Sequence, residues 1–191
     1  MIYYLFGKSA SGKDTIYKRL KDLHPTWKEV TPYTTRPIRE GEREGIEYHF
    51  VTDQKMDQFE RDGQIIEERI YQTVYGPWRY ATVDDGQILL GQDEDYLMIG
   101  VLRSYVSTRD YFGAENVFPI YIEVPDDIRL ARARAREMKE ANPKFAEMMR
   151  RFEADNADFS EDNLAAAGIS KRYLNLDLEK CIEEINQDTG K

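Results

Sequence analysis

The residues next to the N-terminus have the types and the spacing that bind phosphate. Gly7 and Gly12 bracket four residues ahead of Lys13, a spacing typical of the loop that holds a nucleoside triphosphate. Glycine permits the tight turn and the close backbone approach, and the lysine reaches the outer phosphates as a point charge. Backbone amides at the start of the next helix supply further donors. We predict a triphosphate site that comprises Gly7, Lys8, Ser9, Ala10, Ser11, Gly12, Lys13, Asp14 and Thr15.

One position in this loop departs from the usual pattern. Asp14 stands where Ser or Thr normally helps to hold Mg²⁺. We therefore expect Mg²⁺, arriving with ATP as the phosphoryl donor, to be held by the Thr15 hydroxyl or the Asp14 carboxylate. The alternative is a Gly-rich turn between any strand and helix. It is disfavoured because the strand, the glycines, the lysine and the helix follow in the order that a phosphate site requires.

A second polar run follows at residues 33–45, with three arginines, two threonines and two glycines but few apolar side chains. Arg36 and Arg39 offer planar forks that suit a monophosphate. Neutral donors are available from the hydroxyls of Thr34, Thr35, Tyr48 and Tyr75. The alternative is a solvated charged loop, which is what most charge runs are. The residues of this run alone leave both interpretations open.

Taken together, the two runs and the residues after them resemble guanylate kinase. The resemblance rests on the phosphate loop and on Thr34-Thr35-Arg36-x-x-Arg39-x-Gly41-Glu42-x-x-Gly45-x-x-Tyr48-x-Phe50-Val51, Ile66-Glu67 and Tyr75-Gly76. It implies transfer of a phosphoryl group from ATP to GMP or dGMP. It also implies that the acceptor nucleotide is bound by Thr34, Arg36, Arg39, Glu42, Tyr48, Glu67 and Tyr75.

Base identity is expected to depend on Glu67. In the resembled family this carboxylate accepts hydrogen bonds from the ring N1–H and the amino group of guanine, a donor pair that adenine lacks. The alternative is an exposed strand glutamate with no ligand.

Four positions depart from the family pattern. Pro32 and Pro77 stand where side-chain hydroxyls are usual, and Met98 and Gly100 stand where the central strand usually carries acids. These changes weaken the prediction of guanine specificity more than that of phosphoryl transfer, which depends on positioning and charge neutralisation. A kinase for another nucleoside monophosphate therefore remains an alternative. So does a non-catalytic module that binds proteins, although the intact phosphate loop favours an enzyme.

Arginines recur late in the chain. Arg132 and Arg136 lie four residues apart and so share a helical face. The resemblance implies that residues 137–157 form a lid whose closure brings Arg136 and Arg151 over the phosphates, with Arg150 as the alternative to Arg151. An exposed helix with local ion pairs would explain the same residues without a ligand. The predicted catalytic residues are Lys13, Arg36, Arg136 and Arg151; Asn175 matches a family position near the adenine of ATP.

The elements that must position these side chains follow from hydrophobic periodicity. Strands are predicted at residues 2–6, 27–30, 46–51, 78–83, 96–101, 117–124 and 172–176, and helices at 13–23, 52–61, 102–112, 126–138 and 177–187. We expect one α/β domain over residues 1–191, with a parallel sheet covered by helices on both faces. Its core spans residues 1–32, 84–136 and 158–191, an inserted mixed α+β lobe spans 33–83, and the helical lid spans 137–157.

Composition limits the remaining possibilities. The chain has 191 residues, 41% of them hydrophobic and 33% charged, as expected for a globular protein. A net charge of -9 argues against a broad nucleic-acid surface, and no apolar run approaches the roughly 20 residues that cross a bilayer. Cys181 is the only cysteine, so an intrachain disulfide is excluded and a cytoplasmic location is expected. The expected partners are small nucleotides, and the oligomeric state is left as monomer or homodimer.

Overall fold

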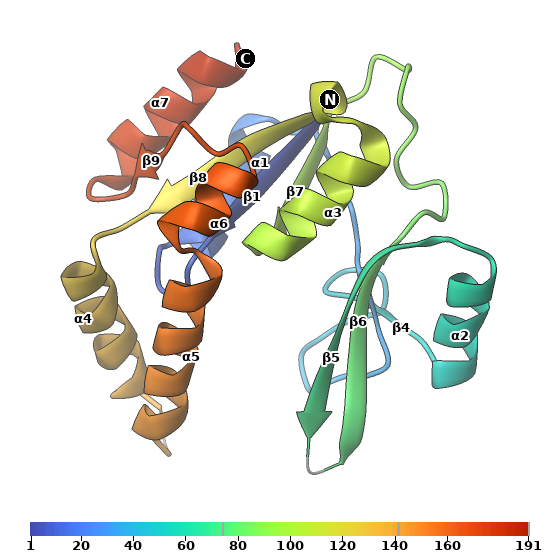
Figure 1. Cartoon of the computed structure of the whole chain (residues 1–191), viewed down its shortest axis with the longest axis horizontal. Helices are drawn as coiled ribbons and strands as arrows, with labels where there is room; N and C mark the ends of the chain where they lie inside the picture. The colour runs from blue at the N-terminus through green and yellow to red at the C-terminus, as the bar shows by residue number, and fades with distance from the viewer. Residues whose placement is uncertain (74, 141, 191) are drawn as a thin grey trace.

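Five parallel strands form the main sheet of the computed structural model, which describes residues 1–73, 75–140 and 142–190 (Figure 1). Their order is β2-β7-β1-β8-β9. The strands are β1 (Ile2–Gly7), β2 (Lys28–Glu29), β7 (Tyr96–Gly100), β8 (Val117–Glu123) and β9 (Tyr173–Leu174). All six residues of β1 are buried, so this central strand contributes side chains to the core on both faces of the sheet.

Helices cover both faces of the main sheet (Figure 1). On one face, α3 (Leu102–Phe112) and α6 (Glu161–Ala166) pack over Tyr4 and Phe6. On the other face, α1 (Lys13–Leu23) and α7 (Leu178–Thr189) pack over Tyr3 and Leu5. A single-turn helix, η1 (Ala114–Asn116), leads into β8. The predicted α/β class with a parallel sheet between two helical layers is confirmed.

A second sheet, in the order β4-β3-β6-β5, lies beside the first. It consists of β3 (Tyr33–Thr34), β4 (His49–Phe50), β5 (Ile65–Thr73) and β6 (Gly76–Val83), and α2 (Asp53–Arg61) follows β4. Met56 and Phe59 of α2 pack against Tyr33, Ala81 and Val83 to form its small core. This sheet contains parallel and antiparallel pairs, in agreement with the predicted mixed lobe.

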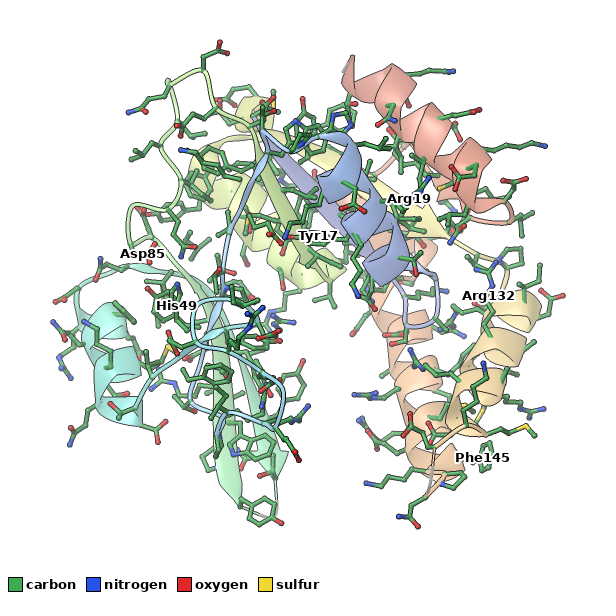
Figure 2. All side chains as sticks on the ribbon, turned by 180° about the vertical axis from the view of Figure 1, so that it is seen from behind. Tyr17, Arg19, His49, Asp85, Arg132 and Phe145 are labelled. Carbon is green, nitrogen blue, oxygen red and sulfur yellow. The ribbon has the colours of Figure 1, made fainter. Side chains whose placement is uncertain are left out.

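Two further helices, α4 (Asp126–Glu137) and α5 (Phe145–Asp158), extend side by side beyond the main sheet (Figure 1). Phe145 begins α5 at the end of this pair away from the sheet (Figure 2). Arg129 joins the two helices: its guanidinium is 1% exposed, lies 3.7 Å above the Phe152 ring, and donates to Asn156 Oδ1 at 2.5 Å.

One predicted strand is shorter than expected, and one helix was not predicted. The strand predicted at residues 46–51 is reduced to His49–Phe50. The Glu47 carboxylate accepts a hydrogen bond from the Arg43 amide and the Glu44 carboxylate accepts one from the Phe50 amide, which holds the preceding segment in turns. Helix α6 was not predicted; the Ser160 side chain accepts a hydrogen bond from the Asn163 amide and caps its start.

Candidate active site

A cleft of about 1420 Å³ separates the phosphate loop from the second sheet. Helices α4 and α5 lie on one side of it and the edge strand β5 on the other (Figure 1). Its lining has more basic than acidic side chains: Lys13, Arg69, Arg103, Arg132, Arg136, Arg150 and Arg151 against Asp14, Glu68, Asp155 and Asp158. The cleft is large enough for two nucleotides and carries the positive charge that their phosphates require.

The phosphate loop, residues 7–15, needs glycine at two positions for different reasons. Gly12 has φ 85°, in the left-handed region, and Ala10 has φ 64°. At Gly7 a Cβ would lie 2.6 Å from the Ile122 carbonyl oxygen of the neighbouring strand. The loop is therefore shaped by the close approach of β8 as well as by its own turns.

Asn175 supports this loop from behind. Its Nδ2 donates to the Ser11 backbone carbonyl oxygen at 2.8 Å, and its backbone carbonyl oxygen accepts from Arg132 Nη2 at 3.0 Å. The residue is 6% exposed and is not among those that line the cleft. Contact of Asn175 with adenine stays a prediction; its observed contacts hold the loop.

Lys13, Asp14 and Thr15 all line the cleft at the start of α1. Within the described part of the chain, Lys13 forms no ion pair. The described residues also contain no group of three or more His, Cys, Asp or Glu side chains that could hold a metal ion. A carboxylate and a hydroxyl next to Lys13 suit Mg²⁺ that is held partly by phosphate oxygens and water.

Helix α5 is docked on the phosphate loop. The Ser9 amide donates to Asp155 Oδ2 at 2.7 Å, and Lys8 Nζ donates to Asn156 Oδ1 at 2.9 Å. Arg129 Nη1 lies 3.5 Å from the same Asp155 oxygen. An anionic oxygen thus already contacts one amide of the loop, which shows that this backbone can bind an anion.

Arg36 and Glu42 form a bidentate pair on the second sheet. Nη1 and Nη2 of Arg36 lie 3.0 and 2.8 Å from the two carboxylate oxygens. The guanidinium also lies 5.5 Å from the centroid of the Tyr48 ring and 5.6 Å from that of Phe50. The pair lowers the pKa of Glu42, chiefly through the hydrogen bond from Arg36. Arg36, Glu42 and Tyr48 therefore lie together, and Arg36 binds Glu42 through two nitrogens while its buried Nε has no hydrogen-bond partner among the described residues.

The other predicted acceptor residues lie in different surroundings. Arg39 is exposed. Thr34 is fully buried, and its hydroxyl donates to the Arg79 carbonyl oxygen at 2.8 Å. Tyr75 is 83% exposed near the β5–β6 turn, beside Trp78. None of the seven predicted acceptor residues lines the cleft, so their nucleotide contacts all stay predictions: Thr34, Arg36, Arg39, Glu42, Tyr48, Glu67 and Tyr75.

Glu67 is 6% exposed, and the hydrogen-bonding side chains next to its carboxylate are those of Ser104 and Arg69. Its nearest cation is Arg69, whose Nη2 lies 3.2 Å from Oε1. Burial raises the pKa of Glu67, and the Arg69 and Arg103 charges oppose that rise. The predicted alternative of an exposed strand glutamate is excluded.

Gly100 sits where the family pattern has an acid, and the structure shows why no side chain is present. A Cβ there would collide with the Tyr4 hydroxyl and lie 3.1 Å from Tyr4 Cε1 and Cζ. Tyr4 is 2% exposed, and desolvation together with the nearby Glu67 charge raises its pKa. The tyrosine ring occupies the space that a residue at position 100 would need.

The arginines of α4 and α5 differ in their engagement. Arg150 makes two hydrogen bonds to Glu147, at 2.8 and 2.7 Å. Arg151 lies 3.5 Å from the same carboxylate and is 62% exposed, while Arg136 forms no ion pair within the described residues. Arg136 and Arg151 line both the main cleft and a smaller cavity of about 260 Å³ between α4 and α5. Arg136 and Arg151, the two arginines expected to act on the phosphates, therefore bind fewer protein groups than Arg150 does.

Five charged cleft residues were not predicted from the sequence: Glu68, Arg69, Arg103, Asp155 and Asp158. A signal existed for Arg69, because residues two apart in a strand share a face and Glu67 had already been singled out. Arg103 and Asp155 carried no such local signal; both reach the cleft only through the packing of α3 and α5.

Comparison with known proteins finds guanylate kinases that are similar to parts of this chain. Residues 2–85 match the family model described as guanylate kinase. The guanylate kinase of Tropheryma whipplei (strain Twist) is 42% identical over 76 residues, 40% of this chain and 38% of the relative. That of Syntrophotalea carbinolica is 27% identical over 162 residues, 84% of this chain and 66% of the relative.

The fold agrees over the whole chain. The crystal structure of guanylate kinase from Anaplasma phagocytophilum matches with a TM-score of 0.67 at 20% identity, covering 100% of this chain and 84% of that one. The sequence alignments, by contrast, span about two fifths to two thirds of the curated relatives named above. In the part of this chain that the structure describes, no helix combines the length and apolar character needed to span a membrane.

Proposed function

From the premise that this chain is a guanylate-kinase-like P-loop protein, we propose that it transfers the γ-phosphoryl group of MgATP to GMP or dGMP. The observation that carries the proposal is the arginine-lined cleft between the phosphate loop and the second sheet. A donor nucleotide at the loop and an acceptor at the sheet would face each other across it. In-line transfer between them needs no protein nucleophile.

The chain's residues supply position and charge. Lys13 and the loop amides hold the donor phosphates, and Arg36, Arg39 and Tyr48 form the acceptor-phosphate side. The bond from Pγ to its bridging oxygen breaks as an oxygen of the acceptor phosphate bonds to Pγ, which releases ADP and a nucleoside diphosphate. Arg136 and Arg151 neutralise the transferring group, and closure of residues 137–157 toward the lobe at 33–83 excludes water.

Mg²⁺ would be held by Asp14 and Thr15 together with phosphate oxygens of ATP. When bound, it neutralises charge on the β- and γ-phosphates. Asp14 is exposed and lines the cleft, so its carboxylate can reach an ion at the loop without displacing a protein partner.

Replacing Asp14 by Ala should raise the Mg²⁺ concentration needed for half-maximal activity by about 10-fold, in the range seen when groups near a metal are removed. The measurement is a Mg²⁺ titration of ADP release at saturating nucleotides. The Asp22→Ala variant, changed on the same helix, is the control. An unchanged Mg²⁺ requirement in Asp14→Ala would show that this carboxylate does not assist the ion.

The proposed reaction is tested by coupled ADP release with ATP and a panel of GMP, dGMP, AMP, CMP and UMP. Turnover with GMP or dGMP well above that with the other three supports it. Binding of ATP without turnover of any of the five would instead favour the non-catalytic, protein-binding alternative.

A second candidate, a kinase for another nucleoside monophosphate, is favoured by one feature. Met98 is 4% exposed and Gly100 has no side chain, so neither position offers a carboxylate to the acceptor. Preferred turnover of a non-guanine nucleotide in the same panel would support this candidate.

A further inference from the structure

Glu67 and Arg69 form a donor–acceptor unit on one face of β5. They are two residues apart in the strand, and Arg69 Nη2 lies 3.2 Å from Glu67 Oε1. Arg69 lines the cleft, while Glu67 lies behind it at 6% exposure. Arg69 therefore faces the cleft, and the Glu67 carboxylate lies next to its guanidinium.

Both members of the unit have unused hydrogen-bonding capacity. The Nε of Arg69 is buried and has no hydrogen-bond partner among the described residues. The Glu67 carboxylate has only the Ser104 hydroxyl and Arg69 beside it, which leaves acceptor sites on its two oxygens for a ligand. Such groups cost free energy unless a partner arrives. A guanidinium has five N–H donors, so Arg69 can face Glu67 and still donate to a ligand in the cleft.

The order of donors and acceptors in this unit matches guanine. The guanine edge presents the O6 acceptor, then the N1–H donor and then the amino donor. Resting on the proposed function, the geometry points to Arg69 as a specificity-determining residue that donates to O6 while Glu67 accepts from N1–H and the amino group. Adenine and cytosine carry an amino donor where guanine has O6 and so meet Arg69 with the wrong group.

Arg69 also compensates for donors that this chain lacks. Pro32 and Pro77 have no side-chain donor, and the carbonyl oxygen of Pro32 is used by the His49 amide. Arg103 is the other cation near Glu67. It is exposed and makes no ion pair within the described residues. Arg103 therefore adds positive charge to the cleft, but no ion pair orients its guanidinium toward a particular ligand atom.

The test compares kcat/KM for GMP, 6-thio-GMP and IMP in the wild type and in Arg69→Met, Arg69→Lys and Arg103→Met. The 6-thio analogue keeps both donors for Glu67 and weakens only the acceptor at position 6. IMP keeps O6 and N1–H but lacks the amino group. The wild type should prefer GMP to 6-thio-GMP by about 10- to 100-fold, the range for a hydrogen bond to a charged group.

In Arg69→Met this preference should fall toward unity, while the preference for GMP over IMP persists because Glu67 is intact. Arg103→Met removes the same charge and should keep both preferences. If the melting curve shows that Arg69→Met does not fold, Arg69→Lys replaces it in the test. Lysine keeps a cation beside Glu67 but lacks the planar fork, so the preference of this variant for GMP over 6-thio-GMP should fall as well.

An Arg69 variant that folds, turns over GMP and keeps the wild-type preference for GMP over 6-thio-GMP would overturn the assignment. Absence of GMP turnover in the wild type is a different result. It would overturn the proposed function, and with it the role of Arg69 in guanine recognition.

Discussion

The Lys13→Met variant should lose ATP-dependent turnover by about 10²- to 10³-fold, the scale seen when one donor to a developing charge is removed. Lys13 lines the cleft at the first position of α1. It forms no ion pair within the described residues, so its charge is available to the phosphates. Because no protein contact is lost, the melting temperature should change little. The measurements are kcat from coupled ADP release and a thermal melt.

A matched control is Lys18→Met, which removes the same charge from an exposed position on the same helix. It should keep wild-type turnover. If Lys13→Met retained more than half of the wild-type kcat, the loop would not be the donor site for transfer.

The Arg36→Met variant should lose both stability and acceptor affinity. The Arg36 side chain is 2% exposed, and its bidentate partner Glu42 is 18% exposed. Removing one member of a buried pair leaves the other without its counter-charge. Because Glu42 is partly solvated, we expect about 2–3 kcal/mol of destabilisation, which for a domain of this size is roughly a 5–10 °C fall in Tm. The KM for GMP should rise in the fraction that stays folded.

Arg39→Met separates these two effects. Arg39 is exposed, and its side chain makes no ion pair in the described residues. This variant should raise the KM for GMP by about 10-fold, the loss of one charge-assisted contact, with an unchanged Tm. Equal loss of stability in both variants would contradict the assignment of Arg36 to the internal pair.

The elements close to the phosphate loop could be predicted because their signals are local. The glycine spacing, Lys13 and the apolar period of α1 lie within one short segment, and helices such as α3 at Leu102–Phe112 have the predicted bounds. Strand β4 could not be predicted at its true length. Its segment has the apolar residues of a strand, but side-chain bonds from Glu44 divert the backbone.

The acceptor side of the site could not be predicted in detail, because it depends on contacts between residues that are far apart in the sequence or that compete for the same partner. Arg36 has the same sequence signature whether its fork meets a phosphate or Glu42, and only the loop geometry decides that it meets Glu42. The missing side chain at Gly100 has its cause in Tyr4, a residue of another strand far earlier in the chain. No periodicity connects two such positions.

The contact between Tyr4 and Gly100 makes the residue types tolerated at these two positions depend on each other. Any side chain at position 100 collides with the Tyr4 hydroxyl and its ring, and overpacking of a buried site is itself destabilising. A side chain at position 100 therefore requires Tyr4 to move or to be replaced by a smaller residue. While Tyr4 keeps its present position, position 100 of β7 has no room for a side chain.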